Sequence, residues 1–109
     1  HSKYTFEVAD TELMFRWFND YEQEAGRAFA EKLVFPAYDY VLKCSHTFNQ
    51  LDAAGAISVS ARAAYIGRVR NLAQNIAKLF LEERCKLGFP LMNDRDAARK
   101  WVEELTPDN

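Results

Sequence analysis

The sequence contains little glycine and proline, with four and three residues among 109. Glycine and proline mark tight turns and interrupt helices, so a chain poor in both favours long uninterrupted helices. Alanine, the strongest helix former, occurs 15 times, whereas valine, isoleucine and threonine together number 13. No run of alternating apolar and polar residues is long enough to suggest a sheet. The composition therefore predicts an all-α fold.

Cysteine is also scarce, since only Cys44 and Cys85 occur and they form no CxxC motif. They cannot supply a disulfide framework, and we expect two free thiols in a reducing cytoplasm. A zinc site needs about four suitable ligands, which two separated cysteines and the one internal histidine, His46, do not provide. The sequence lacks the glycine-rich phosphate loops and the HExxH and GxSxG motifs. We therefore predict no catalytic residue, no metal site and no cofactor within these residues.

Long apolar runs and a strong net charge are missing as well. No stretch approaches the ~20 apolar residues of a membrane-spanning helix, so no membrane partner is expected. The net charge of −2 argues against a protein built mainly to coat nucleic acid. Hydrophobic residues make up 49% of the chain, which supports one compact core. We treat residues 1–109 as a single helical domain, with residues 1–2 interpreted as a cloning remnant.

Helix-start and helix-stop signals divide this domain into four segments. The predicted helices cover residues 11–32, 36–55, 59–88 and 94–105. Asp10, Ser58 and Asn93 are the expected N-caps, and Pro36 suits a first turn because its missing N–H is not needed there. Gly88 is expected to end the third helix in the left-handed conformation. The short connections favour antiparallel neighbours, so the sequence predicts an antiparallel bundle of about four helices.

The first predicted helix carries more apolar residues than one face can hold. Five of its six residues at positions 13–18 are apolar, and they spread over roughly 200° of the helix surface. A second helix or a partner protein must therefore cover the additional face.

The second predicted helix places polar residues within its apolar arc. Ser45, Asn49 and Asp52 recur at spacings of four and three among the residues expected to be buried. A buried polar group without a hydrogen bond costs about 1–3 kcal/mol, so each should find a partner. We predict that Asp52 pairs with Arg62 or caps the backbone amides near residues 56–58. A polar stripe that binds a ligand is the alternative.

The third predicted helix has a basic outer face. No acidic residue occurs between Arg62 and Leu81, whereas Arg68, Arg70 and Lys78 project away from its apolar arc. Together with Arg62, these residues could contact RNA phosphates or an acidic protein surface. An ordinary solvated face is the alternative. His46 is expected to be exposed, and on a helix it points about 200° away from Cys44, so the two cannot form a nucleophile–base pair.

Several uncommon strings occur in a distinctive order. They are YDYVLKCSHTFNQLDA over residues 38–53, GAISVS over 55–60, YIGRVR over 65–70 and LGFPL over 87–91. Together with the opening YTFE over residues 4–7, they closely resemble the α subunit of the bacterial, α2β2 type of glycyl-tRNA synthetase. The resemblance covers roughly residues 3–92. The chain departs from the family pattern at Ala54, where arginine is usual, and at Ala61, where glutamate would complete a capping box with Ser58.

The resemblance implies membership of a class II enzyme that joins glycine to tRNA with ATP and Mg²⁺ in the cytoplasm. In that family the catalytic motifs lie N-terminal to this helical region, and none of them is present here. The resemblance therefore implies a C-terminal helical domain whose partners are the β subunit, a second α subunit and, through the whole enzyme, tRNA(Gly). We expect it to dock subunits and brace the catalytic domain. Direct contact with tRNA through the face from Arg62 to Lys78 is the alternative.

Overall fold

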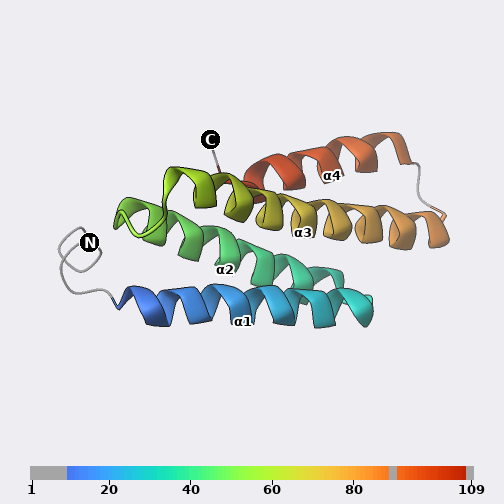
Figure 1. Cartoon of the computed structure of the whole chain (residues 1–109). Coiled ribbons are helices and arrows are strands. Elements are labelled where there is room, and N and C mark those ends of the chain that lie inside the picture. Colours follow the sequence, from blue (N-terminus) through green and yellow to red (C-terminus); the bar gives the residue numbers. More distant parts are fainter. Residues whose placement is uncertain (1–9, 89–90, 108–109) are drawn as a thin grey trace.

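The computed structural model describes residues 10–88 and 91–107, which form four helices and no strand. Figure 1 shows them running alternately in opposite directions along one long axis. The helices are α1 (Thr11–Ala30), α2 (Val34–Ala53), α3 (Val59–Lys86) and α4 (Leu91–Leu105). The predicted all-α antiparallel bundle is confirmed. No helix among the described residues is long and apolar enough to cross a membrane.

Two of the predicted N-caps are formed. The Asp10 carboxylate accepts a hydrogen bond from the backbone N–H of Leu13 at 3.1 Å. The Ser58 hydroxyl accepts one from the backbone N–H of Ala61, also at 3.1 Å. Each bond satisfies a donor that the first turn of a helix leaves free, and so fixes where α1 and α3 begin.

The predicted cap at Asn93 is wrong. Helix α4 begins at Leu91, so Asn93 lies inside its first turn. The neighbouring Asp94 is buried and accepts a hydrogen bond from Arg84 of α3 at 3.0 Å, which ties this first turn to the preceding helix. Tertiary contact therefore overrides a local capping preference. Pro36 does lie in the first turn of α2, although that helix begins two residues earlier, at Val34.

Compact turns reverse the chain between the first three helices. Lys32 adopts the left-handed conformation with φ 60°, which ends α1 at Ala30 instead of at Lys32 as predicted. The N–H of Leu33 donates to the carbonyl of Ala28 at 2.9 Å, closing this turn. Gly55, with φ 71°, serves the same purpose after α2. The predicted left-handed Gly88 is also found, with φ 80°, whereas the proline that follows it lies outside the described residues.

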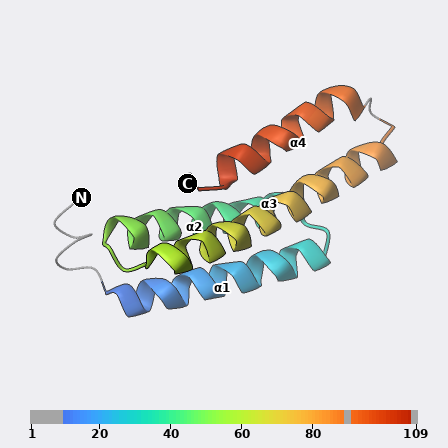
Figure 2. The ribbon, with the colours of Figure 1, turned by 45° about the horizontal axis from the view of Figure 1, so that its top comes forward.

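The helices do not form a closed square. Helix α1 packs against α2 and α3, whereas α4 packs mainly on α3 and touches α2 only slightly. Among the described residues α1 and α4 make no contact, and Figure 2 shows them on opposite sides of the α2–α3 pair. The body is elongated, with extents of 51 × 25 × 25 Å, because the helices share one axis and the longest, α3, has 28 residues.

Aromatic rings fill the core along this axis. Phe18 meets the edge of Tyr65 at a centroid distance of 5.0 Å, which joins α1 to α3. Trp101 of α4 lies 4.5 Å from Phe80 and 5.1 Å from Tyr38, which joins α4 to α3 and α2. The apolar arc predicted for the third helix is confirmed, since most apolar residues of α3 are buried or packed against the core, and Ala98 and Leu105 of α4 are buried as well.

Candidate docking surface and basic residues

The surplus apolar face of α1 is largely covered within the chain. Met14 and Phe18 are buried, and Phe15 packs against Tyr65 of α3 at a centroid distance of 5.9 Å. Trp17 keeps 37% of its surface exposed. The first of the two expectations for this face, coverage by another helix, is therefore found for most of its residues.

Six large apolar side chains of the described residues are exposed: Trp17 on α1, Val59 at the start of α3, and four others near helix ends. We define the turn-end surface as four residues that lie at the end of α1, the start of α2 and the end of α3: Phe29, Leu33, Phe35 and Leu87. Phe35 is 74% exposed and Leu87 71% exposed. In Figure 1 the end of α1 and the start of α2 lie side by side, and α3 runs past them to the right of the view. Monomeric proteins rarely leave clustered apolar groups in water, so this surface is a candidate interface.

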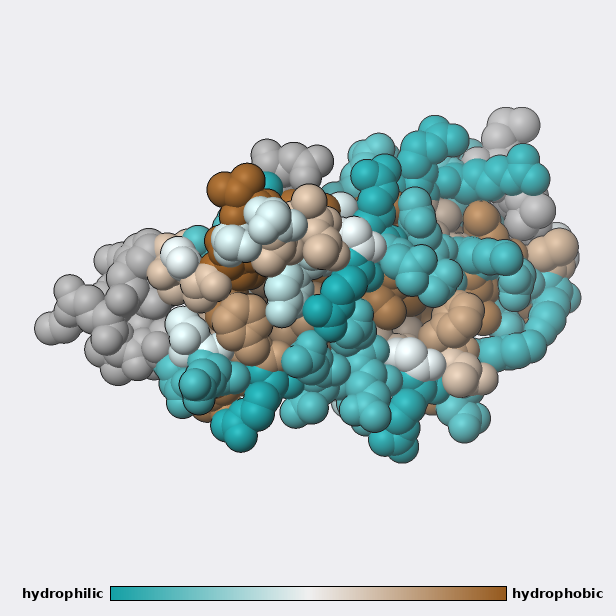
Figure 3. All heavy atoms as spheres, viewed as in Figure 1, coloured by the Kyte–Doolittle hydropathy of each residue, from teal (hydrophilic) through white to brown (hydrophobic). Residues whose placement is uncertain are grey.

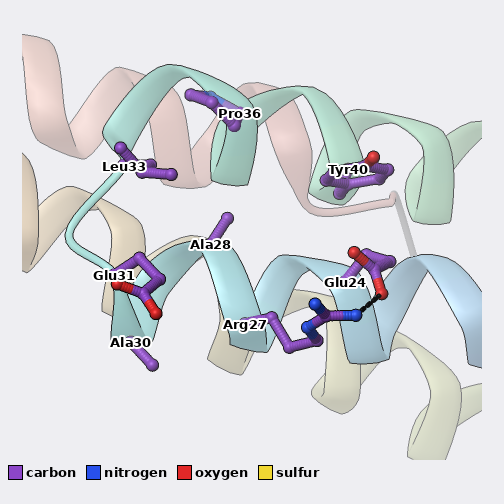
Figure 4. Close-up of a pocket in the computed structure, with 8 residues that line it drawn as sticks. All are labelled: Glu24, Arg27, Ala28, Ala30, Glu31, Leu33, Pro36 and Tyr40. Carbon is purple, nitrogen blue, oxygen red and sulfur yellow. Dashed lines mark hydrogen bonds and ion pairs between the residues drawn. The ribbon is translucent and has the colours of Figure 1, made fainter.

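Two hollows lie in the turn-end surface. One, of about 230 Å³, lies between the start of α2 and the end of α3 and is lined by Val34, Phe35, Phe80, Glu83, Arg84 and Leu87. The other, of about 320 Å³, lies between α1 and α2 (Figure 4) and is lined by Glu24, Arg27, Ala28, Ala30, Glu31, Leu33, Pro36 and Tyr40. Figure 4 shows Pro36 and Tyr40 on α2, with Leu33 directly before it, opposite Glu24 on α1 and Glu31 directly after α1.

The sequence did not lead us to predict the turn-end surface. Helical periodicity identifies residues on a buried stripe, whereas Phe35 and Leu87 stand at helix ends, where no stripe is established. The sequence did contain one signal for this surface. Phe35 directly precedes Pro36 and Leu87 directly precedes Gly88, and this proline and glycine mark helix boundaries. In Figure 3 polar side chains cover most of α4, whereas apolar side chains also reach the surface at the other end of the bundle, near the start of α3.

The polar stripe of α2 is only partly as expected. Asp52 pairs with Arg62, whose Nε donates to Oδ2 at 3.1 Å, as one of the two predictions stated. Ser45 is buried, but Asn49 is exposed, so its predicted place in the buried arc is wrong. Asn49 lines an open polar hollow together with Glu103 and Glu104 of α4, so α4 approaches this side of α2 without burying Asn49.

A polar hollow of about 400 Å³ adjoins these residues, lined by Ser45, Asn49, Arg62, Glu103, Glu104, Thr106 and Pro107. The Thr106 hydroxyl is buried, and among the described residues it has no hydrogen-bond partner. The other lining groups carry charges of both signs, with Arg62 already bonded to Asp52. This mixture does not select one class of ligand.

The four basic residues do not form one outer face. Arg68 was predicted to project to solvent, but its guanidinium donates to Glu22 at 3.0 Å and to Asn19 at 2.9 Å, both on α1. Its guanidinium carbon also lies 4.9 Å from the ring centroids of Phe18 and Tyr65. The prediction of an outward Arg68 is wrong because α1 packs along this side of α3. The hydrogen bonds to Glu22 raise the Arg68 pKa, so the residue stays charged.

Arg70 and Lys78 are exposed, as predicted, and no ion pair of either is found within residues 10–88 and 91–107. Arg62 and Arg68 are paired with carboxylates, so only two of the four basic residues, Arg70 and Lys78, have no ion pair within this described part of the chain. Two separated cations provide little of the charge density that phosphate binding requires.

The reactive side chains are placed as the sequence suggested. His46 is exposed. The Cys44 thiol is buried and donates a weak hydrogen bond to the Phe18 carbonyl at 3.7 Å, and burial raises its pKa to about 12. Cys85 is exposed. Over the described residues, no three His, Cys, Asp or Glu side chains are grouped so that they could hold a metal ion.

Most of this sequence matches a known protein family. The sequence model of the family described as "Glycyl-tRNA synthetase alpha subunit" matches residues 1–85. This match covers more than half of the chain and includes α1, α2 and nearly all of α3. The protein therefore belongs to the glycyl-tRNA synthetase alpha subunit family.

Proposed function

We propose that these residues form the C-terminal helical domain of a glycine–tRNA ligase α subunit, which docks the β subunit and braces the catalytic domain. The observation that carries the proposal is the turn-end surface, where four large apolar side chains are exposed at the end of α1, the start of α2 and the end of α3. Family membership supplies the partner, since an alpha subunit implies a synthetase with a second kind of subunit.

The chemistry of the ligase is assigned to other parts of the enzyme. The described residues hold no grouped metal ligands, and Cys44, with a pKa of about 12, is a poor nucleophile at neutral pH. We therefore place ATP, its Mg²⁺ and the glycine site in the catalytic part of the α subunit. These helices contribute rigid surface, within a cytoplasmic enzyme.

The proposed bracing is supported by ion pairs that join different helices. Arg68 ties α3 to α1, Arg62 ties α3 to α2, and Arg84 ties α3 to α4. Each pair is partly screened from water, which makes it stronger than a pair on the open surface. A domain held in this way can transmit a fixed geometry between subunits.

Binding to purified β subunit tests the proposal directly. We expect the chain, or the α subunit that contains it, to form a complex that light scattering resolves at a defined mass. A chain that stays monomeric and binds neither β nor the separately expressed catalytic part would overturn the proposal.

Direct contact with tRNA is the second candidate. Arg70 and Lys78 are the exposed cations that support it, whereas the pairing of Arg62 and Arg68 weakens it. Phosphate contacts would make binding to tRNA(Gly) fall steeply with added salt, and Arg70→Ala with Lys78→Ala would reduce both affinity and salt slope. Unchanged binding in this double variant would remove the candidate.

A further inference from the structure

The two hollows of the turn-end surface are adjacent along the first turn of α2. Leu33 lines the hollow between α1 and α2, and its neighbours Val34 and Phe35 line the hollow between α2 and α3. Both hollows therefore border the start of α2. The smaller hollow, at about 230 Å³, is below the ~300 Å³ typical of small-molecule sites and matches a large apolar side chain better.

The charges around the hollows are unequal. Arg27 bonds to Glu24 at 2.8 Å, Arg84 bonds to Asp94 at 3.0 Å, and Glu83 lies 3.6 Å from Lys86. Glu31 is different, because no cation of the described residues lies within 4.0 Å of its carboxylate. Lys32 follows it in the chain but does not line the hollow.

We infer that the turn-end surface seats an apolar helix of the β subunit, with a lysine or arginine of that helix paired to Glu31. An apolar side chain of the helix fills the hollow between Phe35 and Leu87, in the manner of helix-in-groove recognition. The basic residue lays its aliphatic stem on Leu33 and Pro36 and brings its charge to Glu31. This inference rests on the proposed docking of β and names the surface and the chemistry of the contact.

The test measures binding of purified β subunit to four variants of the full chain by calorimetry. Phe35→Ser combined with Leu87→Ser removes exposed apolar surface, and Glu31→Lys reverses the unmatched charge. The matched controls are Val59→Ser, which changes a 91% exposed apolar residue at the far end of α3, and Asp20→Lys, which reverses an exposed charge on α1. Circular dichroism confirms that each variant is folded.

We expect the double variant to bind at least roughly tenfold more weakly, as for loss of an interface hot spot. Glu31→Lys should also bind roughly tenfold more weakly and lose much of the salt dependence. Both controls should bind as the unmodified chain does. Unchanged binding in the double variant or in Glu31→Lys overturns the inference.

Other outcomes separate this inference from the function on which it rests. If the unmodified chain binds β but the double variant only prevents self-association, the surface joins two copies of the chain and the inference fails, while the docking of β stands. If the unmodified chain does not bind β at all, the proposed docking fails and the inference falls with it.

Discussion

Arg68 on α3 and Glu22 on α1 are joined by hydrogen bonds from one guanidinium to both carboxylate oxygens, across 46 positions of the sequence. The same guanidinium reaches Asn19 and stacks over two aromatic rings. The pair therefore fixes how α1 lies along α3. It does so beside the additional apolar face of α1, which α3 covers.

Replacing Arg68 with alanine should destabilise the fold. The change removes charged hydrogen bonds and a cation–π contact in a half-buried setting, which together contribute about 1–2 kcal/mol to the free energy of unfolding. Thermal melting should show a drop of roughly 4–8 °C per kcal/mol for a domain of this size. Arg68→Lys should recover little, because lysine cannot form the two-pronged contact.

Arg70→Ala is the matched control for this measurement, since Arg70 is exposed on the same helix. Its melting temperature should stay close to that of the unmodified chain. Equal melting temperatures for Arg68→Ala and Arg70→Ala would show that the contact with Glu22 contributes nothing to stability.

Replacing Asp52 with alanine should also lower the melting temperature. Asp52 and Arg62 pair across the turn between α2 and α3, with both side chains about one-third exposed, so we expect a loss of about 0.5–1 kcal/mol. A double-mutant cycle with Arg62→Ala measures the coupling. Asp39→Ala, which breaks an exposed pair with Lys43 within α2, is the control and should cost less. A coupling energy of zero would contradict the prediction.

Lys32→Gly should stabilise the protein. Lys32 has φ 60°, a conformation that costs a residue with a side chain about 1–2 kcal/mol and costs glycine almost nothing. Glycine gains freedom in the unfolded chain, which offsets part of this, so the net gain should be about 0.5–1 kcal/mol in urea-unfolding experiments. Gly55→Ala, at φ 71°, should show the opposite sign. A destabilised Lys32→Gly would mean that the lysine side chain has a stabilising contact of its own.

The two cysteines should differ sharply in reactivity. Exposed Cys85 should react with a disulfide reagent at pH 8 in the native protein, whereas buried Cys44, with its pKa near 12, should react only when the chain unfolds. One thiol per native chain and two per unfolded chain is the expected count. Rapid modification of two thiols under native conditions would refute it.

The raised pKa of Cys44 also predicts a loss of stability at alkaline pH. Between the ordinary thiol value near 9 and about 12, the unfolded chain releases this proton while the folded chain keeps it. Stability from this group is complete below pH 9 and declines above it, by about 1.4 kcal/mol per pH unit. Cys44→Ala should lack this component, so unfolding curves of both proteins from pH 8 to 10.5 isolate it. Parallel losses in the two proteins would contradict the assignment.

Several helix boundaries follow from the sequence alone, because those boundaries depend on interactions between residues close together in the chain. Asp10 and Ser58 cap α1 and α3 through bonds to residues three positions away, and Gly55 and Gly88 end helices by their own backbone freedom. These signals depend only on neighbours along the chain. The helical fold, its antiparallel order and the buried arc of α3 could therefore be predicted, as could the pairing of Asp52 with Arg62 across a short turn.

The tertiary structure alone decided which surfaces stay open. Arg68 had the sequence setting of a solvated cation, but α1 lies beside it and supplies Glu22. Asn49 had the setting of a buried group, but a polar hollow between it and the end of α4 leaves it exposed. Phe35 and Leu87, far apart in the chain, come together because antiparallel packing brings the start of α2 to the end of α3. The helical period determines the direction in which each side chain points from its own helix. Which neighbouring helix, if any, that side chain contacts depends on how all four helices pack together.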